Sequence, residues 1–183
     1  MSTSPTPLEY ALLGLLRTNP QSGYDLRKTF SSTPMRHYSD SPGSIYPALR
    51  RMEAKAWIAG SAEGASARKR QVFRVTGSGE HALGEWLRRP VTRDDLIWRL
   101  DQLMLRFAFL DGNVPRQVTM EFLAAMEREL ESYVRELRAF ARDSGRTGSV
   151  DTGTLAFGFG IESYQANLDW ARRARQQLKG RRT

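Results

Sequence analysis

The sequence predicts a mainly α-helical fold in two parts, residues 1–90 and residues 91–183. Apolar residues recur every three or four positions along most of the chain, as on the buried stripe of a helix. The segment around Phe73 alternates instead, as a strand does. Pro90 separates the two parts and also divides the charge: residues 1–90 carry 13 basic and 7 acidic side chains, a net of +6, against +2 for the rest.

The composition of the 183 residues excludes several classes of protein. Hydrophobic residues make up 40% and charged residues 26%, which are globular averages. Because there is no cysteine, disulfides, thiolate zinc sites, iron–sulfur clusters and cysteine nucleophiles are excluded. The net charge of +8 suits a polyanionic partner. We find no apolar run long enough for a membrane span and no basic leader, so we expect a cytoplasmic protein. With a polyanionic partner it would be nucleoid-associated. We expect no cofactor and no metal.

Capping signals predict two short helices at the start of the chain. Thr6-Pro7-Leu8-Glu9 combines a cap hydroxyl, proline at the first helical position and an acid three residues after the cap, and Asn19-Pro20 ends the segment. Ser22-Gly23-Tyr24-Asp25 repeats the cap, and Leu26 and Phe30 supply a buried stripe. A tight turn therefore separates the two helices.

A third helix with one apolar face and one cationic face is predicted next. Its apolar stripe is spaced by 4, 3 and 4 residues and consists of Ile45, Leu49, Met52 and Ala56. Tyr46, Arg50 and Arg51 fall outside this stripe. Because Pro47 lacks an N–H, we expect Ser44 to cap the helix, so that Pro47 lies in the first turn.

A β-hairpin and a fourth helix follow. Residues 57–59 and 71–76 are predicted strands, and the connection between them is cationic because it holds Arg68, Lys69 and Arg70. Helical spacing returns from Gly77 and ends before Pro90.

The second half is predicted to be helical throughout. One helix covers Leu96 to Phe107, and residues 111–115 break the pattern. The next helix has a seam of alternating steps of 3 and 4, as in a coiled coil, and requires a partner helix. After the connection at residues 143–153, the last helix is apolar over a wide arc, so we expect it to be buried on several sides.

Three helices followed by a hairpin is the order of a winged helix-turn-helix, whose third helix enters the major groove of DNA while the hairpin touches the backbone. Arginine can bind guanine O6 and N7 in a bidentate manner, and a cationic hairpin suits phosphates. A basic run by itself is more often a solvated surface, and Tyr46 could equally be core, so the combination carries the prediction. The predicted DNA contacts are Ser22, Tyr24, Ser44, Tyr46, Pro47, Arg50, Arg51, Lys55, Arg68, Lys69 and Arg70.

Residues 8–89 resemble the PadR family of bacterial transcriptional regulators. The segments that carry the resemblance are Leu12-Leu13-Gly14-Leu15-Leu16, Ser22-Gly23-Tyr24-Asp25-Leu26, residues 44–53 (SIYPALRRME), Val72-Phe73-Arg74-Val75-Thr76, Gly79 and Glu85-Trp86-Leu87. The helical second half is similar to the larger, virulence-activator-like subfamily. The resemblance implies a homodimer on a pseudo-palindromic operator, commonly a repressor released by a small molecule. The family usually has glycine where this chain has Ala56, and alanine in a left-handed cap costs about 1 kcal/mol.

Two further sets of residues are predicted in the second half. The dimerisation set takes the seam and one stripe of the last helix: Leu123, Met126, Leu130, Tyr133, Leu137, Phe140, Phe157, Ile161, Tyr164 and Leu168. Trp98, Phe107 and Trp170 could line a pocket for a small aromatic effector, although aromatic residues at helical spacing are more often core.

Other functions have weaker support. Residues 77–82 match a relaxed dinucleotide fingerprint, but no strand follows to complete a βαβ unit. His81 has no nearby cysteine or second histidine, so we predict no enzyme. A winged helix can also serve as a protein-interaction module without specific DNA binding, which is our alternative prediction.

Overall fold

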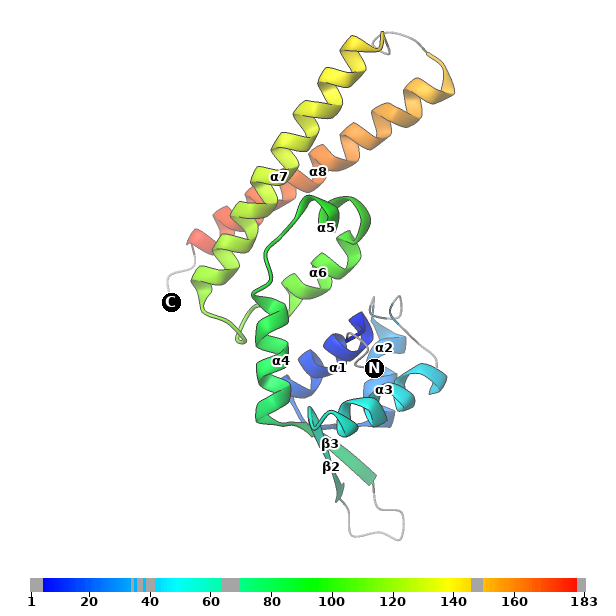
Figure 1. Cartoon of the computed structure of the whole chain (residues 1–183), viewed down its shortest axis with the longest axis vertical. Helices are drawn as coiled ribbons and strands as arrows, with labels where there is room; N and C mark the ends of the chain where they lie inside the picture. The colour runs from blue at the N-terminus through cyan, green and yellow to red at the C-terminus, as the bar shows by residue number, and fades with distance from the viewer. Residues whose placement is uncertain are drawn as a thin grey trace. The chain divides into compact units, whose positions relative to one another are not determined.

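The computed structural model describes residues 5–33, 35, 38, 42–63, 70–145 and 150–180. It divides into two compact units, Met1–Arg88 and Arg89–Thr183 (Figure 1), and each unit is described by itself. The predicted fold class is confirmed: the chain is mainly helical, with one small antiparallel sheet.

The first unit has the predicted order of three helices, a hairpin and a fourth helix, with one short strand added between the first two helices. Its elements are α1 (Pro7–Thr18), β1 (Gln21–Ser22), α2 (Gly23–Ser32), α3 (Pro42–Ala54), β2 (Ile58–Glu63), β3 (Arg70–Val75) and α4 (Gly77–Leu87). The sheet order is β1-β3-β2, and both pairings are antiparallel. Leu12, Leu26, Phe30, Ile45 and Leu49 are fully buried, so the three helices share one core.

Both predicted capping boxes are present. The Glu9 amide donates to the Thr6 hydroxyl at 3.3 Å, and the Thr6 amide donates to the Glu9 carboxylate at 3.2 Å. The Asp25 amide donates to the Ser22 hydroxyl at 3.3 Å, and the Ser22 amide donates back to Asp25. These caps satisfy amide groups that the first turn of a helix leaves without intrahelical partners.

The start of α3 differs from the prediction. The helix begins at Pro42, two residues before the expected Ser44 cap, and Pro47 lies inside it rather than in its first turn. The reason is that Pro42 occupies the first helical position, where a missing N–H is harmless and the fixed φ favours the helix. The two-residue strand β1 was also missed, because two residues are too few to show an alternating pattern.

Helix α3 ends in a Schellman motif at Ala56. This residue has φ of 54°, so the left-handed position expected there is confirmed. The Trp57 amide donates to the Met52 carbonyl at 2.9 Å, and the Ala56 amide donates to the Glu53 carbonyl at 2.8 Å, the two bonds that define the motif. The exit of α3 is therefore fixed although the position carries a methyl group instead of glycine.

The start of α4 packs on the exit of α3. The hydroxyls of Thr76 and Ser78 both donate to the Ala56 carbonyl, and the Thr76 amide donates to the Trp57 carbonyl at 3.0 Å. A Cβ on Gly79 would lie 2.1 Å from the Trp57 carbonyl oxygen, so this approach requires glycine.

The second unit consists of two short helices and a long helical hairpin. Its elements are α5 (Arg93–Trp98), α6 (Leu100–Ala108), α7 (Arg116–Asp143) and α8 (Thr152–Gly180). The single helix predicted for Leu96 to Phe107 is wrong, because the backbone breaks at Arg99, where φ is −141° and ψ is 33°. The predicted break at residues 111–115 is confirmed, with Gly112 at φ 75°.

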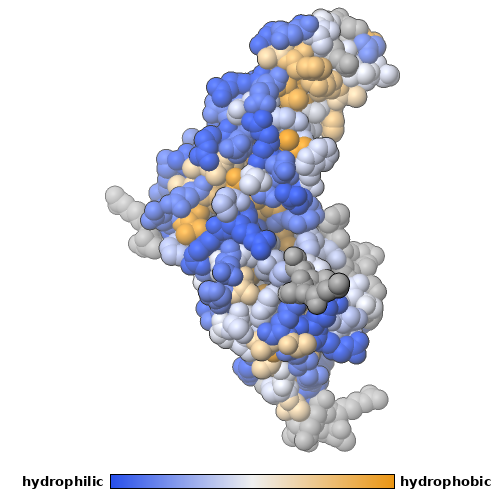
Figure 2. All heavy atoms as spheres, in the orientation of Figure 1, coloured by the Kyte–Doolittle hydropathy of each residue, from blue (hydrophilic) through white to orange (hydrophobic). Residues whose placement is uncertain are grey.

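Helices α7 and α8 lie side by side in opposite directions (Figure 1). Aromatic pairs join them, Tyr133 with Tyr164 at 4.9 Å and Phe140 with Phe157 at 5.5 Å between ring centroids. Figure 2 shows apolar side chains gathered toward the loop end of this hairpin. The expectation that α8 is buried on several sides is not met within one chain, because only Leu168 and Ala171 are buried in it.

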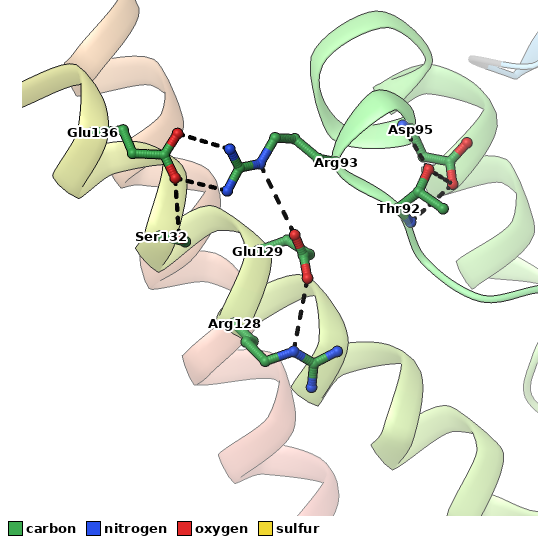
Figure 3. A network of polar contacts seen from close by, with 7 residues as sticks. All are labelled: Thr92, Arg93, Asp95, Arg128, Glu129, Ser132 and Glu136. Atoms are coloured by element: carbon green, nitrogen blue, oxygen red, sulfur yellow. Dashed lines mark hydrogen bonds and ion pairs between the residues drawn. The ribbon is translucent and has the colours of Figure 1, made fainter.

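Helix α5 is attached to α7 by a network of ion pairs (Figure 3). Both terminal nitrogens of Arg93 donate to Glu136, at 2.7 and 2.8 Å, and Nε of Arg93 lies 4.0 Å from Glu129. The hydrogen bond from Arg93, together with the Ser132 hydroxyl and nearby positive charge, lowers the pKa of Glu136. Thr92 and Asp95 cap the helix in the manner of Thr6 and Glu9.

In the described part of the chain, no helix has the length and apolar character that a membrane crossing requires.

Candidate nucleic-acid interface

The outer face of α3 presents polar and aromatic groups, as predicted. Ile45, Leu49 and Met52 face the core, while Ser44 and Arg50 are exposed and Tyr46 is 43% exposed. Arg50 has no ion-pair partner among the residues that the structure describes. Its side chain is exposed on the face of α3 away from the core, as a base-reading side chain requires.

Arg51 and Lys55 are placed differently from Arg50, because both contact a buried acid on α1. Nε of Arg51 donates to Oε1 of Glu9 at 2.8 Å, and Nζ of Lys55 lies 3.3 Å from Oε2. Glu9 is 1% exposed. Burial by itself would raise the pKa of Glu9, but the hydrogen bonds from Arg51, Thr6 and Lys55 outweigh it and hold the pKa below its ordinary value.

Lys55 is directed inward by a second contact as well. Its ammonium lies 4.7 Å from the centroid of the Trp57 ring, so a cation–π contact adds to its ion pair with Glu9. Three basic residues were predicted on this helix. Arg50 has no ion pair with any described residue, Arg51 is held by one nitrogen, and Lys55 is mostly engaged within the protein.

A second cationic and aromatic group lies at the start of α2. Tyr24 is 51% exposed, and the guanidinium carbons of Arg27 and Arg70 lie 5.5 and 5.8 Å from its ring centroid. The hydrogen bond from the Ser22 hydroxyl, together with the charges of Arg70 and Lys28, lowers the pKa of Asp25 beside this group. Arg70, which was predicted in the connection of the hairpin, is instead the first residue of β3, opposite the end of β2, and this end of the strand lies next to Tyr24 of α2.

Some predicted contacts have other roles or lie outside the described residues. The Ser22 hydroxyl is buried and donates to Asp25 at 2.6 Å, so it serves the helix cap and is not free for DNA. Pro47 is half-buried within α3. Arg68 and Lys69, which were predicted in the connection of the hairpin, lie outside the described residues.

The sequence analysis missed three residues that form or support this surface. Arg27 lies three positions after Tyr24 on one helix, a spacing that could have indicated it. Glu9 was assigned only to a cap, and its contacts with residues 42 and 46 positions away leave no local signal. Gly23 allows α3 to approach α2, because a Cβ there would lie 2.6 Å from Cε1 of Tyr46.

The predicted dimerisation residues of the second unit are largely covered within the single chain. Leu123, Met126, Leu130 and Leu168 are buried. Tyr133, Leu137, Phe157, Ile161 and Tyr164 are half-buried in the α7–α8 hairpin. Phe140 is exposed. The chain's own α8 is therefore a partner of the seam on α7.

The three predicted effector residues are not brought together. Phe107 and Trp170 pack edge to face at 5.3 Å, and Phe122 lies 5.7 Å from Phe107. Trp98, at the end of α5, is 76% exposed and has no described aromatic contact.

The first unit combines three helices, a hairpin directly after the third, and an exposed aromatic and cationic face on that third helix. This combination defines a winged helix-turn-helix. This is a class of DNA-binding domain. Residues 12–85 match the sequence profile described as "Transcriptional regulator PadR-like family", so the resemblance to that family drawn from residues 8–89 is confirmed.

Two similar proteins are named as transcriptional regulators. "Negative transcriptional regulator PadR" of Bacillus subtilis is 30% identical over 105 residues, which span 56% of this chain and 56% of that protein. "Probable transcriptional regulator Rv1176c" of Mycobacterium tuberculosis is 27% identical over 188 aligned positions, 96% of this chain and 99% of that one.

Two solved structures are also similar. Bacillus subtilis PadR in complex with operator DNA has a TM-score of 0.45 at 22% identity and covers 94% of this chain and 99% of that one. The same protein in complex with p-coumaric acid has a TM-score of 0.44 at 20% identity and covers 98% and 100%.

Proposed function

We propose that the protein binds double-stranded DNA in a sequence-specific manner and regulates transcription, with α3 in the major groove. The observation that carries this proposal is the outward face of α3, where Tyr46 and Arg50 are exposed on the side away from the core-facing apolar stripe. Tyr24, Arg27 and Arg70 extend the positive surface toward the hairpin, as contacts to the phosphate backbone require.

Selection of bound DNA from a random pool tests this function. We expect an enriched inverted repeat whose half-site centres lie about one helical turn, or a multiple of it, apart. Arg50→Ala should lower affinity for that DNA by about 1–3 kcal/mol, because one base contact is lost. The control Arg128→Ala removes one positive charge from an exposed site in the second unit and should leave affinity nearly unchanged. Absence of any enriched sequence would favour the protein-interaction module instead.

We propose that the protein acts as a homodimer through the outer face of the α7–α8 hairpin. Leu155 and Phe159, four residues apart on α8, are 60% and 73% exposed, and Phe140 on α7 is exposed as well. A second copy would cover these side chains, and contiguous exposed apolar groups commonly mark such interfaces. A dimer would also provide the two symmetric readers that an inverted repeat needs.

Sedimentation of the full chain over a range of concentrations tests the dimer. Phe159→Glu should shift the protein toward monomer, because a charge would be buried against apolar groups. Gln176→Glu adds the same charge at another exposed position of α8 and should leave the dimer intact. A wild-type monomer at every concentration would refute the dimer.

We propose that the regulation is repression relieved by a small aromatic carboxylate bound in the second unit. Phe107, Phe122 and Trp170 form a cluster of rings, and the guanidinium of Arg106 lies 5.0 Å from the ring of Phe122. Arg106 is buried, its Nε has no hydrogen-bond partner within the described structure, and burial lowers its pKa. A carboxylate would neutralise this buried charge.

The p-coumaric acid molecule provides a probe, with p-coumaryl alcohol as a matched control that lacks the carboxylate. We expect the acid, and not the alcohol, to lower affinity for the selected DNA and to change tryptophan fluorescence. Equal effects of the two compounds, or no effect of either, would contradict an anionic aromatic effector.

A further inference from the structure

Glu9 places a negative charge directly behind the DNA-facing side of α3. It lies on α1 and is 1% exposed, and its partners are Arg51 on α3 and Lys55, the residue directly after the end of α3. Taking a carboxylate out of water is unfavourable unless donors surround it. Three donors do so here: Nε of Arg51, Nζ of Lys55 and the amide of Thr6.

The contact with Glu9 uses only part of the Arg51 guanidinium. Nε donates at 2.8 Å, whereas the two terminal nitrogens have no polar partner in the part of the chain that the structure describes. The Arg51 side chain is 47% exposed, although its carboxylate partner is buried. A guanidinium is a rigid planar fork, so fixing Nε fixes the plane in which the two terminal nitrogens can donate.

A guanidinium fixed in this way is suited to a base rather than to a phosphate. Bidentate recognition of guanine O6 and N7 depends on the orientation of the fork, whereas a phosphate contact depends mainly on charge. The Glu9 carboxylate neutralises one of the two positive charges of Arg51 and Lys55, which weakens their attraction for phosphates. Arg50, one residue earlier, has no such anchor among the side chains that the structure describes.

We propose that Glu9 is a specificity-determining positioning residue, which holds Arg51 by Nε so that its two terminal nitrogens read a guanine edge in the major groove. The inference rests on the proposed function, because it requires α3 to enter that groove. The ionised state of Glu9 agrees with it, since the hydrogen bonds from Arg51, Thr6 and Lys55 overcome burial and keep its pKa low.

Removing the Glu9 charge should have opposite effects on specific and nonspecific binding. Glu9→Gln leaves Arg51 less firmly oriented, so discrimination at one guanine of the selected DNA should fall roughly 5- to 150-fold, the range for one bidentate contact. The substitution also removes one negative charge near DNA, so affinity for unrelated DNA should rise and its salt dependence should become steeper. A purely structural role would lower both affinities together.

The experiment measures competition binding of the full chain to the selected DNA, to that DNA with the guanine replaced, and to unrelated DNA. Glu80→Gln is the matched control, because Glu80 is an exposed acid of the same unit that pairs with Arg17 instead of α3. It should leave discrimination unchanged. In an Arg51→Ala background, Glu9→Gln should cause no further loss of discrimination.

The binding measurements separate failure of the proposed function from failure of the inference about Glu9. If the wild type selects no sequence, the proposed function itself fails. If it selects one and Glu9→Gln keeps the discrimination, or loses it additively with Arg51→Ala, the inference about Glu9 is overturned. Arg51→Lys covers the case in which Glu9→Gln does not fold: it retains the charge but lacks the fork, so the same guanine preference should be lost while nonspecific affinity stays. An unchanged preference in Arg51→Lys would also overturn the inference.

Discussion

Replacing Ala56 with glycine should stabilise the first unit. Ala56 has φ of 54°, and the left-handed conformation costs an L-residue roughly 1–2 kcal/mol. Glycine avoids that strain, but it makes the unfolded chain more flexible at a cost of roughly 0.4–1 kcal/mol. The Ala56 side chain is exposed, so no packing is lost, and the backbone bonds of the Schellman motif remain. The net gain expected for Ala56→Gly is on the order of 0.5–1 kcal/mol.

Urea unfolding of the full chain by tryptophan fluorescence measures this gain, and peptide-level hydrogen exchange assigns the transition to the first unit. Ala54→Gly is the matched control, because Ala54 is exposed but helical, where glycine costs about 1 kcal/mol. The two substitutions, two residues apart, should therefore shift the urea midpoint in opposite directions. If Ala56→Gly lowers the midpoint or leaves it unchanged, the strain attributed to this position is absent.

Two further predictions concern the stability of the same unit. Gly79→Ala should lower the free energy of unfolding by roughly 1–3 kcal/mol, because the added Cβ would meet the Trp57 carbonyl. Gly77 has open space around it, so the control Gly77→Ala should be tolerated. Equal shifts of the urea midpoint in the two variants would contradict this. The folded state lowers the pKa of Glu9, so its ionised form adds stability above the ordinary glutamate range, about pH 4, and that stability is lost as the pH falls through the lowered value. Glu9→Gln should flatten this acid limb, and parallel losses in variant and wild type would show that Glu9 does not contribute.

Local signals in the sequence predicted most elements of the first unit and failed where two local rules competed. The capping boxes at Thr6 and Ser22 need only neighbouring residues, and both are present. At α3, the rule for Pro47 predicted a late start, but the start signal of Pro42 prevailed. The break at Arg99 has no glycine or proline to announce it, so helical spacing ran through it.

The sequence could not distinguish a partner helix of the same chain from one of a second copy. A coiled-coil seam has the same spacing in both cases. In the structure, Leu130 is buried within the chain, so a charge there would test folding, whereas the exposed Phe159 tests association. The candidate DNA surface shows a similar limit: the exposure of Arg50 follows from its place on the helix, but the contact of Arg51 with Glu9 depends on how α1 and α3 pack.

The two hydroxyl groups that bond the Ala56 carbonyl have a mechanical consequence. Thr76 and Ser78 stand at the beginning of α4, the last helix before the chain enters the second unit, and Ala56 stands at the end of α3. A shift of α4 along its axis must either move the end of α3 with it or break both bonds. Tension on the connecting chain would thus reach the end of α3 through the carbonyl groups of Ala56 and Trp57.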